Sequence, residues 1–272
     1  EISLSDAQKI EPDYEVGEEV SEEVDFHKFG RRAILNLRQT LASKILELEH
    51  DSLYNKYKDR VGQVVSGEVY QIWKKELLLV DDEGNELILP KSEQIPSDFY
   101  RKGDHVRAVV ERVDNQNNNP KIILSRTSPM FLQRLFELEV PEIQDGTVLI
   151  KGIAREAGSR SKMAVRATIE GLDPVGACVG PRGGRVGAVV EELGGEKIDI
   201  VVWSEDPCEY VKAALSPADV ISVTPIPGSK ACRVIVPDDQ LSLAIGKEGQ
   251  NARLAARLTG YKIDIKPESQ AE

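Results

Sequence analysis

The sequence is poor in the residues that build large cores, disulfide frameworks and metal sites. Aromatic residues make up only 5% of its 272 positions, so we expect several small aliphatic cores rather than one large core. Cys178, Cys208 and Cys232 stand far apart and form no CxxC pair, which excludes a disulfide framework and a cysteine zinc site. We expect all three to pack as small apolar side chains in a reducing cytoplasm.

The sequence also lacks the runs and motifs that mark membrane spans and common enzymes. No stretch approaches the roughly 18 consecutive apolar residues of a membrane helix. Neither the nucleophile motif G-x-S-x-G nor the phosphate-binding motif GxxxxGK followed by Ser or Thr occurs. His27, His50 and His105 show no metal-ligand spacing. We therefore expect a protein that is not an enzyme, uses no cofactor or metal and has no membrane partner.

Acidic residues exceed basic ones, and the net charge of -11 at first argues against a nucleic-acid ligand. Much of the excess lies in residues 11–25, which hold eight acids and no base. Residues 151–185, in contrast, hold seven bases and three acids, and residues 230–266 hold seven bases and four acids. Because a phosphate chain responds to the local field, these two basic stretches keep nucleic acid as a candidate ligand.

The N-terminal segment predicts one long helix and little else. Residues 1–25 show no clear pattern, and we expect them to be poorly ordered on their own. From Phe26 to about Tyr57, apolar residues recur every three or four positions, which predicts an amphipathic helix with Asp25 as its N-cap. We expect this helix to serve as a structural strut. The sequence begins at Glu1 without an initiator Met or a secretory signal, so we expect a fragment or a processed product.

Residues 61–128 are rich in β-branched and aliphatic residues and predict five short strands. Turn signals such as Asp82-Glu83-Gly84-Asn85 and Lys102-Gly103-Asp104 separate them. Five strands in about 70 residues favour a small barrel, and the OB-fold is the commonest barrel of this size. The expected strands are 61–72, 76–80, 86–89, 105–113 and 122–125.

Residues 129–272 contain an internal repeat with a spacing of 66 positions. Gly180-Pro181-Arg182-Gly183 in the first copy is matched by Gly246-Lys247-Glu248-Gly249 in the second. Around each tetrapeptide the predicted order is αββααβ, and a repeat across several elements is far stronger evidence than either tetrapeptide alone. The expected elements are 130–137, 147–154, 163–168, a short helix near 177, 185–193 and 197–200, then 209–215, 220–226, 231–236, a short helix near 243, 251–258 and 262–265.

A Gly-x-x-Gly loop between two helices suits the backbone of a single-stranded nucleic acid. Glycine lets a phosphate approach the main chain, and the helix that follows offers free N–H groups to an anion. KH domains use this arrangement to clamp about four nucleotides. Glu248 should weaken phosphate contact in the second loop. The candidate RNA-binding residues are Gly180, Pro181, Arg182, Gly183, Arg185, Gly246, Lys247, Glu248 and Gly249.

Longer motifs around both loops resemble the NusA family of bacterial transcription factors. Asp173 to Gly180, Arg182-Gly183 and Glu196 to Val201 are similar to the family's first KH domain. The second KH domain of the family is matched by Ala244 to Lys247, Gly249-Gln250-Asn251 and Arg253-Leu254-Ala255. Residues 61–128 resemble its S-one-type OB-fold. The resemblance adds Arg160, Lys162 and Gln250 to the candidate RNA-binding residues.

The resemblance implies a factor that associates with RNA polymerase and nascent single-stranded RNA to modulate pausing, termination and antitermination. Other antitermination factors are further implied partners, and we expect a cytoplasmic monomer. The long helix resembles the family's connector, with most of an N-terminal polymerase-binding domain, and any C-terminal extension, outside the sequence. The expected domains are 1–60, the remnant and connector; 61–128, the S-one-type OB-fold; 129–204, the first KH domain; and 205–272, the second. Because residues 204–207 form so short a linker, we expect the two KH domains to make one rigid unit.

One departure from the pattern concerns the OB-fold. RNA-binding S-one domains usually carry aromatics and a His on one barrel face, where this sequence has Lys74 to Leu79 and Pro90 or Lys91. Tyr70 and Trp73 are candidate stacking surfaces, although Trp73 also suits a core or an interface.

Two other functions are open. The RNA-binding tail of a nuclease such as polynucleotide phosphorylase also joins KH and S-one modules, but there the KH module comes first. A protein scaffold whose KH folds have lost RNA binding is the other alternative. An RNA titration with both loops mutated would separate the scaffold from the two RNA-binding hypotheses.

Overall fold

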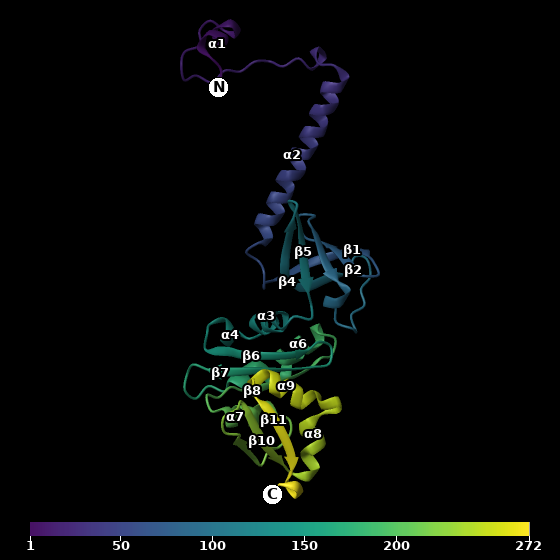
Figure 1. Ribbon diagram of the computed structural model, residues 1–272, viewed down its shortest axis with the longest axis vertical. Helices are drawn as coiled ribbons and strands as arrows, with labels where there is room; N and C mark the ends of the chain where they lie inside the picture. The colour runs from purple at the N-terminus through teal and green to yellow at the C-terminus, as the bar shows by residue number, and fades with distance from the viewer. Residues whose placement is uncertain (272) are drawn as a thin grey trace. The chain divides into compact units, whose positions relative to one another are not determined.

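The computed structural model describes residues 1–271, which divide after Ser52 into two compact units (Figure 1). The first unit contains helix α1 (Leu4–Ile10), a 3-10 turn η1 (Phe26–Lys28) and most of helix α2 (Arg31–Tyr57). Helix α1 lies in the segment for which the sequence predicts no element. The Ser3 hydroxyl caps α1 by accepting from the Asp6 amide at 3.2 Å, and Ala7 is buried.

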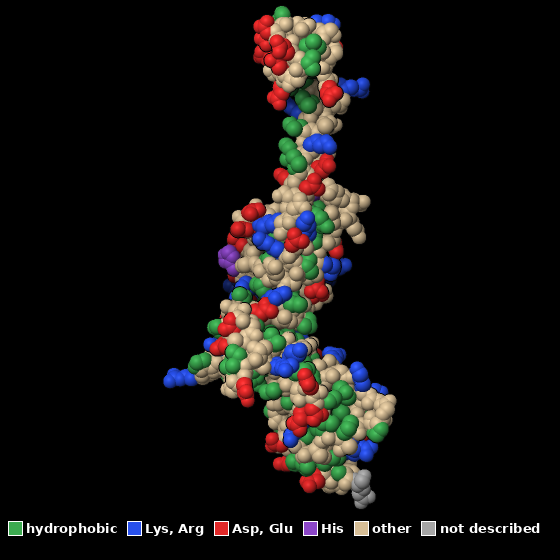
Figure 2. Space-filling view, turned by 90° about the vertical axis from the view of Figure 1, so that its left-hand side faces the viewer, with side chains coloured by type: hydrophobic (Ala, Val, Ile, Leu, Met, Phe, Trp, Pro, Cys, Tyr) green, Lys and Arg blue, Asp and Glu red, His purple; other side chains and the backbone are tan. Residues whose placement is uncertain are grey.

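The long helix begins later than its apolar pattern predicts. Asp25 does act as a cap, but it caps η1 by accepting from the His27 amide at 2.9 Å. The chain then passes through Gly30, a poor helix former, before α2 starts at Arg31. The apolar stripe of α2 is exposed in this structure, and Leu41 and Leu48 are 57% and 68% exposed. Figure 2 shows acidic side chains gathered over the N-terminal unit.

Strands β1 to β5 form a closed barrel in the order β1-β2-β3-β5-β4, as an OB-fold requires. Their inward side chains, among them Val69, Leu79, Leu87 and Leu124, make one aliphatic core. Tyr57 at the end of α2 is buried in the same core. The strands are β1 (Val64–Ile72), β2 (Glu76–Val80), β3 (Glu86–Pro90), β4 (His105–Gln116) and β5 (Asn119–Ser125).

Each KH domain is a three-stranded sheet with helices packed against it, in the predicted order αββααβ. In both sheets the middle strand pairs antiparallel with the strand before it and parallel with the last strand. The first domain has one extra short helix, α4 (Pro141–Gln144). The other elements are α3 (Pro129–Glu139), β6 (Val148–Glu156), β7 (Arg160–Ala167), α5 (Pro174–Val179), α6 (Gly184–Glu192) and β8 (Lys197–Val202), then α7 (Pro207–Ala214), β9 (Ser222–Pro225), β10 (Ala231–Val236), α8 (Leu241–Ile245), α9 (Gln250–Thr259) and β11 (Lys262–Pro267). The predicted fold class is confirmed.

The two KH domains pack directly against each other. Helix α9 of the second domain lies against β6 and β7 of the first (Figure 1). Tyr210 is buried between them, and its hydroxyl donates to the Leu258 carbonyl oxygen at 3.3 Å. Ala164, Val201 and Tyr210 share a small apolar cluster that spans both domains. The structure thus shows the two KH domains packed together, and the rigidity of the unit that the short linker predicts stays a prediction.

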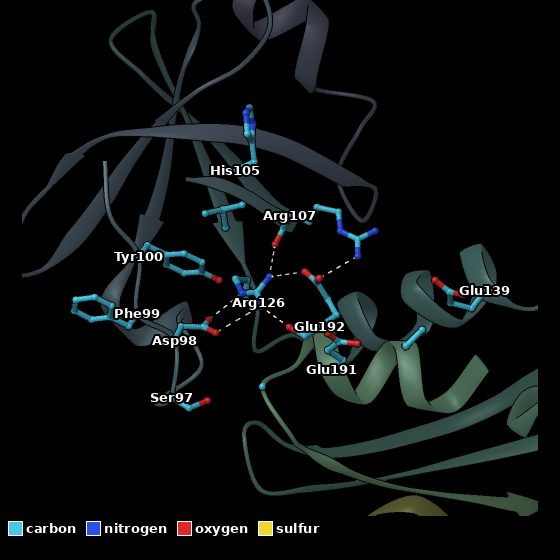
Figure 3. Close-up of a pocket in the computed structure, with 13 residues that line it drawn as sticks. Ser97, Asp98, Phe99, Tyr100, His105, Arg107, Arg126, Glu139, Glu191 and Glu192 are labelled. Atoms are coloured by element: carbon cyan, nitrogen blue, oxygen red, sulfur yellow. Dashed lines mark hydrogen bonds and ion pairs between the residues drawn. The ribbon is translucent and has the colours of Figure 1, made fainter. Parts of the chain in front are cut away.

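The barrel and the first KH domain are joined by a buried arginine (Figure 3). The Arg126 guanidinium donates to Asp98 at 2.8 Å and to the Glu192 carboxylate at 3.0 Å. It also donates to the carbonyl oxygens of Arg107 and Glu192 at 2.7 and 2.8 Å. Burial opposes ionisation of Glu192, but the bonds from Arg107 and Arg126 outweigh it and hold the pKa of this carboxyl below its usual value. Among residues 1–271, no helix is long and apolar enough to cross a bilayer.

Candidate nucleic-acid interface

The two Gly-x-x-Gly loops have the same backbone conformation. The first glycine has φ of 75° in Gly180 and 80° in Gly246. The third residue has φ of 55° in Arg182 and 56° in Glu248. This left-handed conformation is uncommon for a residue with a side chain, and two unrelated loops would have no reason to share it. The sequence repeat is therefore also a structural repeat.

The first glycine of each loop is required by its contact with the helix that follows. A Cβ on Gly180 would lie 2.6 Å from Arg185 Cγ, and a Cβ on Gly246 would lie 2.7 Å from the Asn251 amide nitrogen. Positions 185 and 251 correspond in the repeat. The first glycine thus lets the loop turn tightly against its own helix, which is a different reason from the phosphate approach that the sequence suggested.

The last glycine of each loop leaves open space. Gly183 and Gly249 have φ of 70° and 74°, and a Cβ at either position would meet no atom within 4 Å. Each is also the N-cap of the next helix, α6 or α9, so no capping side chain stands over that helix start. An anion can approach the main chain here at little steric cost.

The middle one of the three aliphatic residues before each loop is buried, and its neighbours are half-buried in the first domain and exposed in the second. Cys178 and Ala244, at matching positions, are fully buried. Leu243 and Ile245, on either side of Ala244, are 42% and 37% exposed. Exposed aliphatic side chains beside a phosphate-binding loop form an apolar wall on which nucleobases can lie.

The charge at the two loops differs in the way the sequence predicts. Arg182 and Lys247 are exposed, and neither takes part in an ion pair within the described chain. Glu248 is exposed beside Lys247 and offsets its charge. The first loop therefore presents a free guanidinium to a phosphate, and the second presents an ammonium next to a carboxylate.

Three other predicted site residues take part in ion pairs and hydrogen bonds within the protein. Lys162 is fully buried, and its ammonium contacts Asp199 at 3.0 Å and the Ser216 carbonyl oxygen at 2.6 Å. Burial lowers the pKa of the Lys162 ammonium, and Asp199 opposes that shift. Arg160 pairs with the same Asp199, and Arg185 pairs with Glu142 at 2.8 Å and bonds the Ala177 carbonyl oxygen.

Lys162 therefore has no surface to offer an RNA strand, and we correct its assignment: it ties the first KH domain to the second. Its position in a motif gave no sign of burial, because the burial comes from the second domain. Strand β7 is covered on both faces, and Lys162 lies on the same face as Ala164, which packs against Tyr210 of the second domain. Arg160 and Arg185 are partly exposed, so only part of each guanidinium faces solvent. Gln250 donates to Ser159 Oγ of the first domain at 2.6 Å.

On the barrel, the two candidate stacking residues lie at the surface. Tyr70 is 39% exposed and Trp73 is 52% exposed, so Trp73 is not a core residue. The Tyr70 hydroxyl bonds the Glu86 carboxylate. An exposed aromatic side chain on an OB-fold is suited to base stacking, although Glu86 beside Tyr70 disfavours phosphate there.

Comparison with protein families divides the chain into four matched segments. Residues 1–51 match the NusA N-terminal domain, and residues 58–126 match the S1 RNA binding domain. Residues 126–203 match the NusA-like first KH domain, and residues 207–272 match the NusA-like second KH domain.

Curated relatives match along the whole chain. A protein of Halalkalibacterium halodurans is 52% identical over 272 residues, which are 100% of this chain and 71% of the relative. Proteins of Bacillus subtilis and Thermus thermophilus are 49% and 44% identical and are covered over 73% and 68% of their lengths. All three are named transcription termination/antitermination protein NusA. These similarities confirm the resemblance drawn from the sequence motifs.

Proposed function

Because the chain belongs to the NusA family of transcription termination/antitermination proteins, we propose that it binds nascent single-stranded RNA through its two Gly-x-x-Gly loops. One observation carries the RNA-binding part of the proposal. The two loops share one strained backbone conformation, and each opens onto a helix start that is free of a capping side chain. If the loops served only to pack two helices together, neither the open space above Gly183 and Gly249 nor the exposed cations would be needed.

The interface is expected to use the exposed atoms of Pro181, Arg182 and Lys247 and the main chain of the four glycines. The apolar wall of Leu243 and Ile245 would receive bases in the second domain. Arg160, Arg185 and Gln250 contribute to RNA binding through the N–H groups that their intramolecular hydrogen bonds leave free. The barrel, with Tyr70 and Trp73 at its surface, is a further RNA contact in the same proposal.

The polymerase part of the proposal rests on the family. Termination and antitermination act on a transcribing polymerase, so we propose that the chain associates with RNA polymerase, and that it does so mainly through its N-terminal segment, which matches the NusA N-terminal domain. The relatives are named as regulatory factors, and the proposed role is regulatory rather than enzymatic. A role in bacterial transcription implies a cytoplasmic protein.

The RNA part is tested by the salt dependence of binding. If about five phosphates are neutralised, the affinity for a single-stranded RNA should fall with salt at a log–log slope of about -3.5. The net charge of -11 would by itself produce the opposite trend, because added salt screens repulsion. Fluorescence anisotropy with a labelled RNA at four or five salt concentrations measures the slope. A flat or rising salt response would refute binding through the basic stretches.

The polymerase part is tested by transcription in vitro. On a template with an intrinsic terminator, adding the chain to a purified bacterial polymerase should change the fraction of terminated transcripts. The change should be smaller for a variant whose first loop cannot bind RNA. The factor then loses part of its RNA contact and is held on the transcribing complex mainly by its polymerase contact. An identical terminated fraction with and without the chain, over a wide range of its concentration, would contradict this part of the proposal.

A further inference from the structure

The second Gly-x-x-Gly loop is held by a hairpin of the other KH domain. The hairpin joins β6 to β7 and includes Glu156 and Ser159. The Arg253 guanidinium on α9 bonds both oxygens of the Glu156 carboxylate, at 2.7 Å and 3.2 Å. The Gln250 amide, at the first position of α9, donates to Ser159 Oγ at 2.6 Å. Two residues of the helix that follows the loop therefore contact the first domain.

Arg253 also reaches back into the loop itself. Its third nitrogen, Nη1, donates to the main-chain carbonyl oxygen of Glu248 at 3.1 Å. A guanidinium is rigid and planar, so a carboxylate that fixes two of its N–H groups also fixes the direction of the others. Glu156 thereby sets, through Arg253, the position of the Glu248 peptide. That peptide belongs to the residue with φ of 56°, whose conformation depends on support from its surroundings.

Among the described residues, the first loop receives no such contact from the other domain, and its own Arg185, which pairs with Glu142, bonds the Ala177 carbonyl oxygen before the loop. At the spacing of the repeat, Gln250 and Arg253 correspond to Gly184 and Gly187, which carry no side chains. The contacts are therefore specific to the second loop, in which Glu248 already weakens the attraction for phosphate. Because the Arg253 charge is neutralised by Glu156, this arginine is placed to hold the loop rather than to bind the RNA.

We propose that Glu156 and Arg253 are positioning residues for the second loop, so that the first KH domain keeps the loop of the second in the shape that receives a phosphodiester. This inference rests on the proposed RNA-binding function. It makes the RNA affinity of the second domain depend on a carboxylate of the first domain that does not itself contact RNA.

The proposal and simple electrostatics predict opposite signs for one substitution. Removing an acid near a phosphate chain lowers repulsion and should tighten binding. If Glu156 positions the loop, Glu156→Ala should instead weaken binding, by about threefold to fivefold, which is the upper range for a partly exposed ion pair. Glu170→Ala is the matched control, since Glu170 is an exposed acid of the same domain outside this set of contacts.

The experiment measures affinity for a single-stranded RNA in two backgrounds. In the otherwise unchanged chain, Glu156→Ala should weaken binding, while Glu170→Ala should leave it unchanged or slightly tighter. In a chain that carries Lys247→Asp and Glu248→Asp, Glu156→Ala should have no further effect, because the loop it positions is already disabled. Without RNA, the amide NMR signals of Gly246 and Gly249 should shift in Glu156→Ala and stay in place in Glu170→Ala.

Several outcomes would overturn the proposal. They are unchanged or tighter RNA binding by Glu156→Ala, an equal loss in both backgrounds, and unshifted amide signals of the loop glycines. The milder Glu156→Gln, which keeps the shape of the side chain, replaces Glu156→Ala if a thermal melt shows unfolding, and the same outcomes apply to it. Absence of RNA binding by the unsubstituted chain would instead refute the proposed function, and the first titration shows this separately.

Discussion

Replacing Pro181 and Arg182 with aspartate should weaken binding of single-stranded RNA by about a hundredfold. The substitution removes a charge-assisted hydrogen bond, which is worth about 1.5–3 kcal/mol, and places two like charges at the point where phosphate approaches. A difference of about 1.4 kcal/mol corresponds to a factor of ten in affinity. The measurement is a titration of a labelled RNA with the variant and with the unsubstituted chain.

The same variant should remain folded. Both side chains are exposed, so no core contact is lost. Residue 182 has φ of 55°, and aspartate is one of the residues that tolerate this conformation well. Loss of Pro181 frees the unfolded chain and costs about 0.4–1 kcal/mol at most. A thermal melt beside the titration should therefore show only a small shift.

A matched control is available in the barrel. Asn117 and Asn118 lie in the exposed hairpin between β4 and β5 and have φ of 53° and 54°. Changing both to aspartate also adds two negative charges at left-handed positions, but outside the loops. This control should keep most of the RNA affinity. If it loses as much as the first-loop variant, net charge and not the loop governs binding.

Substitutions in the two loops should also differ in how much RNA affinity they cost. Lys247→Asp with Glu248→Asp should cost less affinity than the first-loop variant. Because the second loop already contains an acid, its charge falls from 0 to -2, whereas that of the first loop falls from +1 to -2. A larger loss from the second loop would reverse this ranking. Unchanged binding by the first-loop variant would refute the assigned function of the KH domains while leaving their fold intact.

The loops can be predicted from the sequence because their information is local and repeated. Two glycines separated by two residues, between two helical patterns, recur at the matching place in the second copy. The left-handed conformation of Arg182 and Glu248, which carry side chains, is found only in the structure. The barrel is predictable for a similar reason, since turn residues separate its short strands. Function cannot be predicted from these local patterns alone, and it is the long motifs shared with a family that indicate it.

The contacts that hold the loops are not predictable in this way. Glu156 and Arg253 are 97 positions apart in the chain, and nothing in either local sequence marks them as partners. Lys162 lies in a basic motif, yet the second KH domain covers its face of β7, and its ammonium contacts Asp199 and the Ser216 carbonyl oxygen. Arg253 lies within a motif that carries the family resemblance, but the motif does not indicate its role. The start of α2 differs from the prediction because Gly30, a poor helix former, separates the short turn η1 from α2.

Removing the carboxylate of Glu196 should destabilise the first KH domain more than any loop substitution. The Glu196 and Arg155 side chains have no exposed surface and are 3.1 Å apart. Glu196 also accepts from the Gly158 amide at 2.7 Å and from Ser161 Oγ at 2.8 Å. Glu196→Ala leaves the Arg155 guanidinium buried without its counter-ion. A broken buried ion pair of this kind costs about 3–5 kcal/mol.

The size of this loss can be measured in the domain itself. The chain has two tryptophans, Trp73 in the barrel and Trp203 after β8, so a Trp73→Phe background leaves Trp203 as the reporter. Urea unfolding followed by Trp203 fluorescence should show the loss for Glu196→Ala. Asp264→Ala, which removes a half-exposed partner 3.8 Å from Arg233, should cost less than about 1 kcal/mol. Equal effects of the two substitutions would show that burial does not control the strength of these pairs.

A double replacement separates the charge from the shape. Arg155→Met with Glu196→Met removes both buried charges and keeps apolar volume in the site, and such replacements are often neutral. The double variant should therefore be more stable than Glu196→Ala, although it leaves the Gly158 amide without its acceptor. Because Glu196 holds the hairpin that carries Glu156 and Ser159, the double variant should still bind RNA less well through the second loop. Full stability together with full RNA affinity would show that the hairpin keeps its shape without the buried pair.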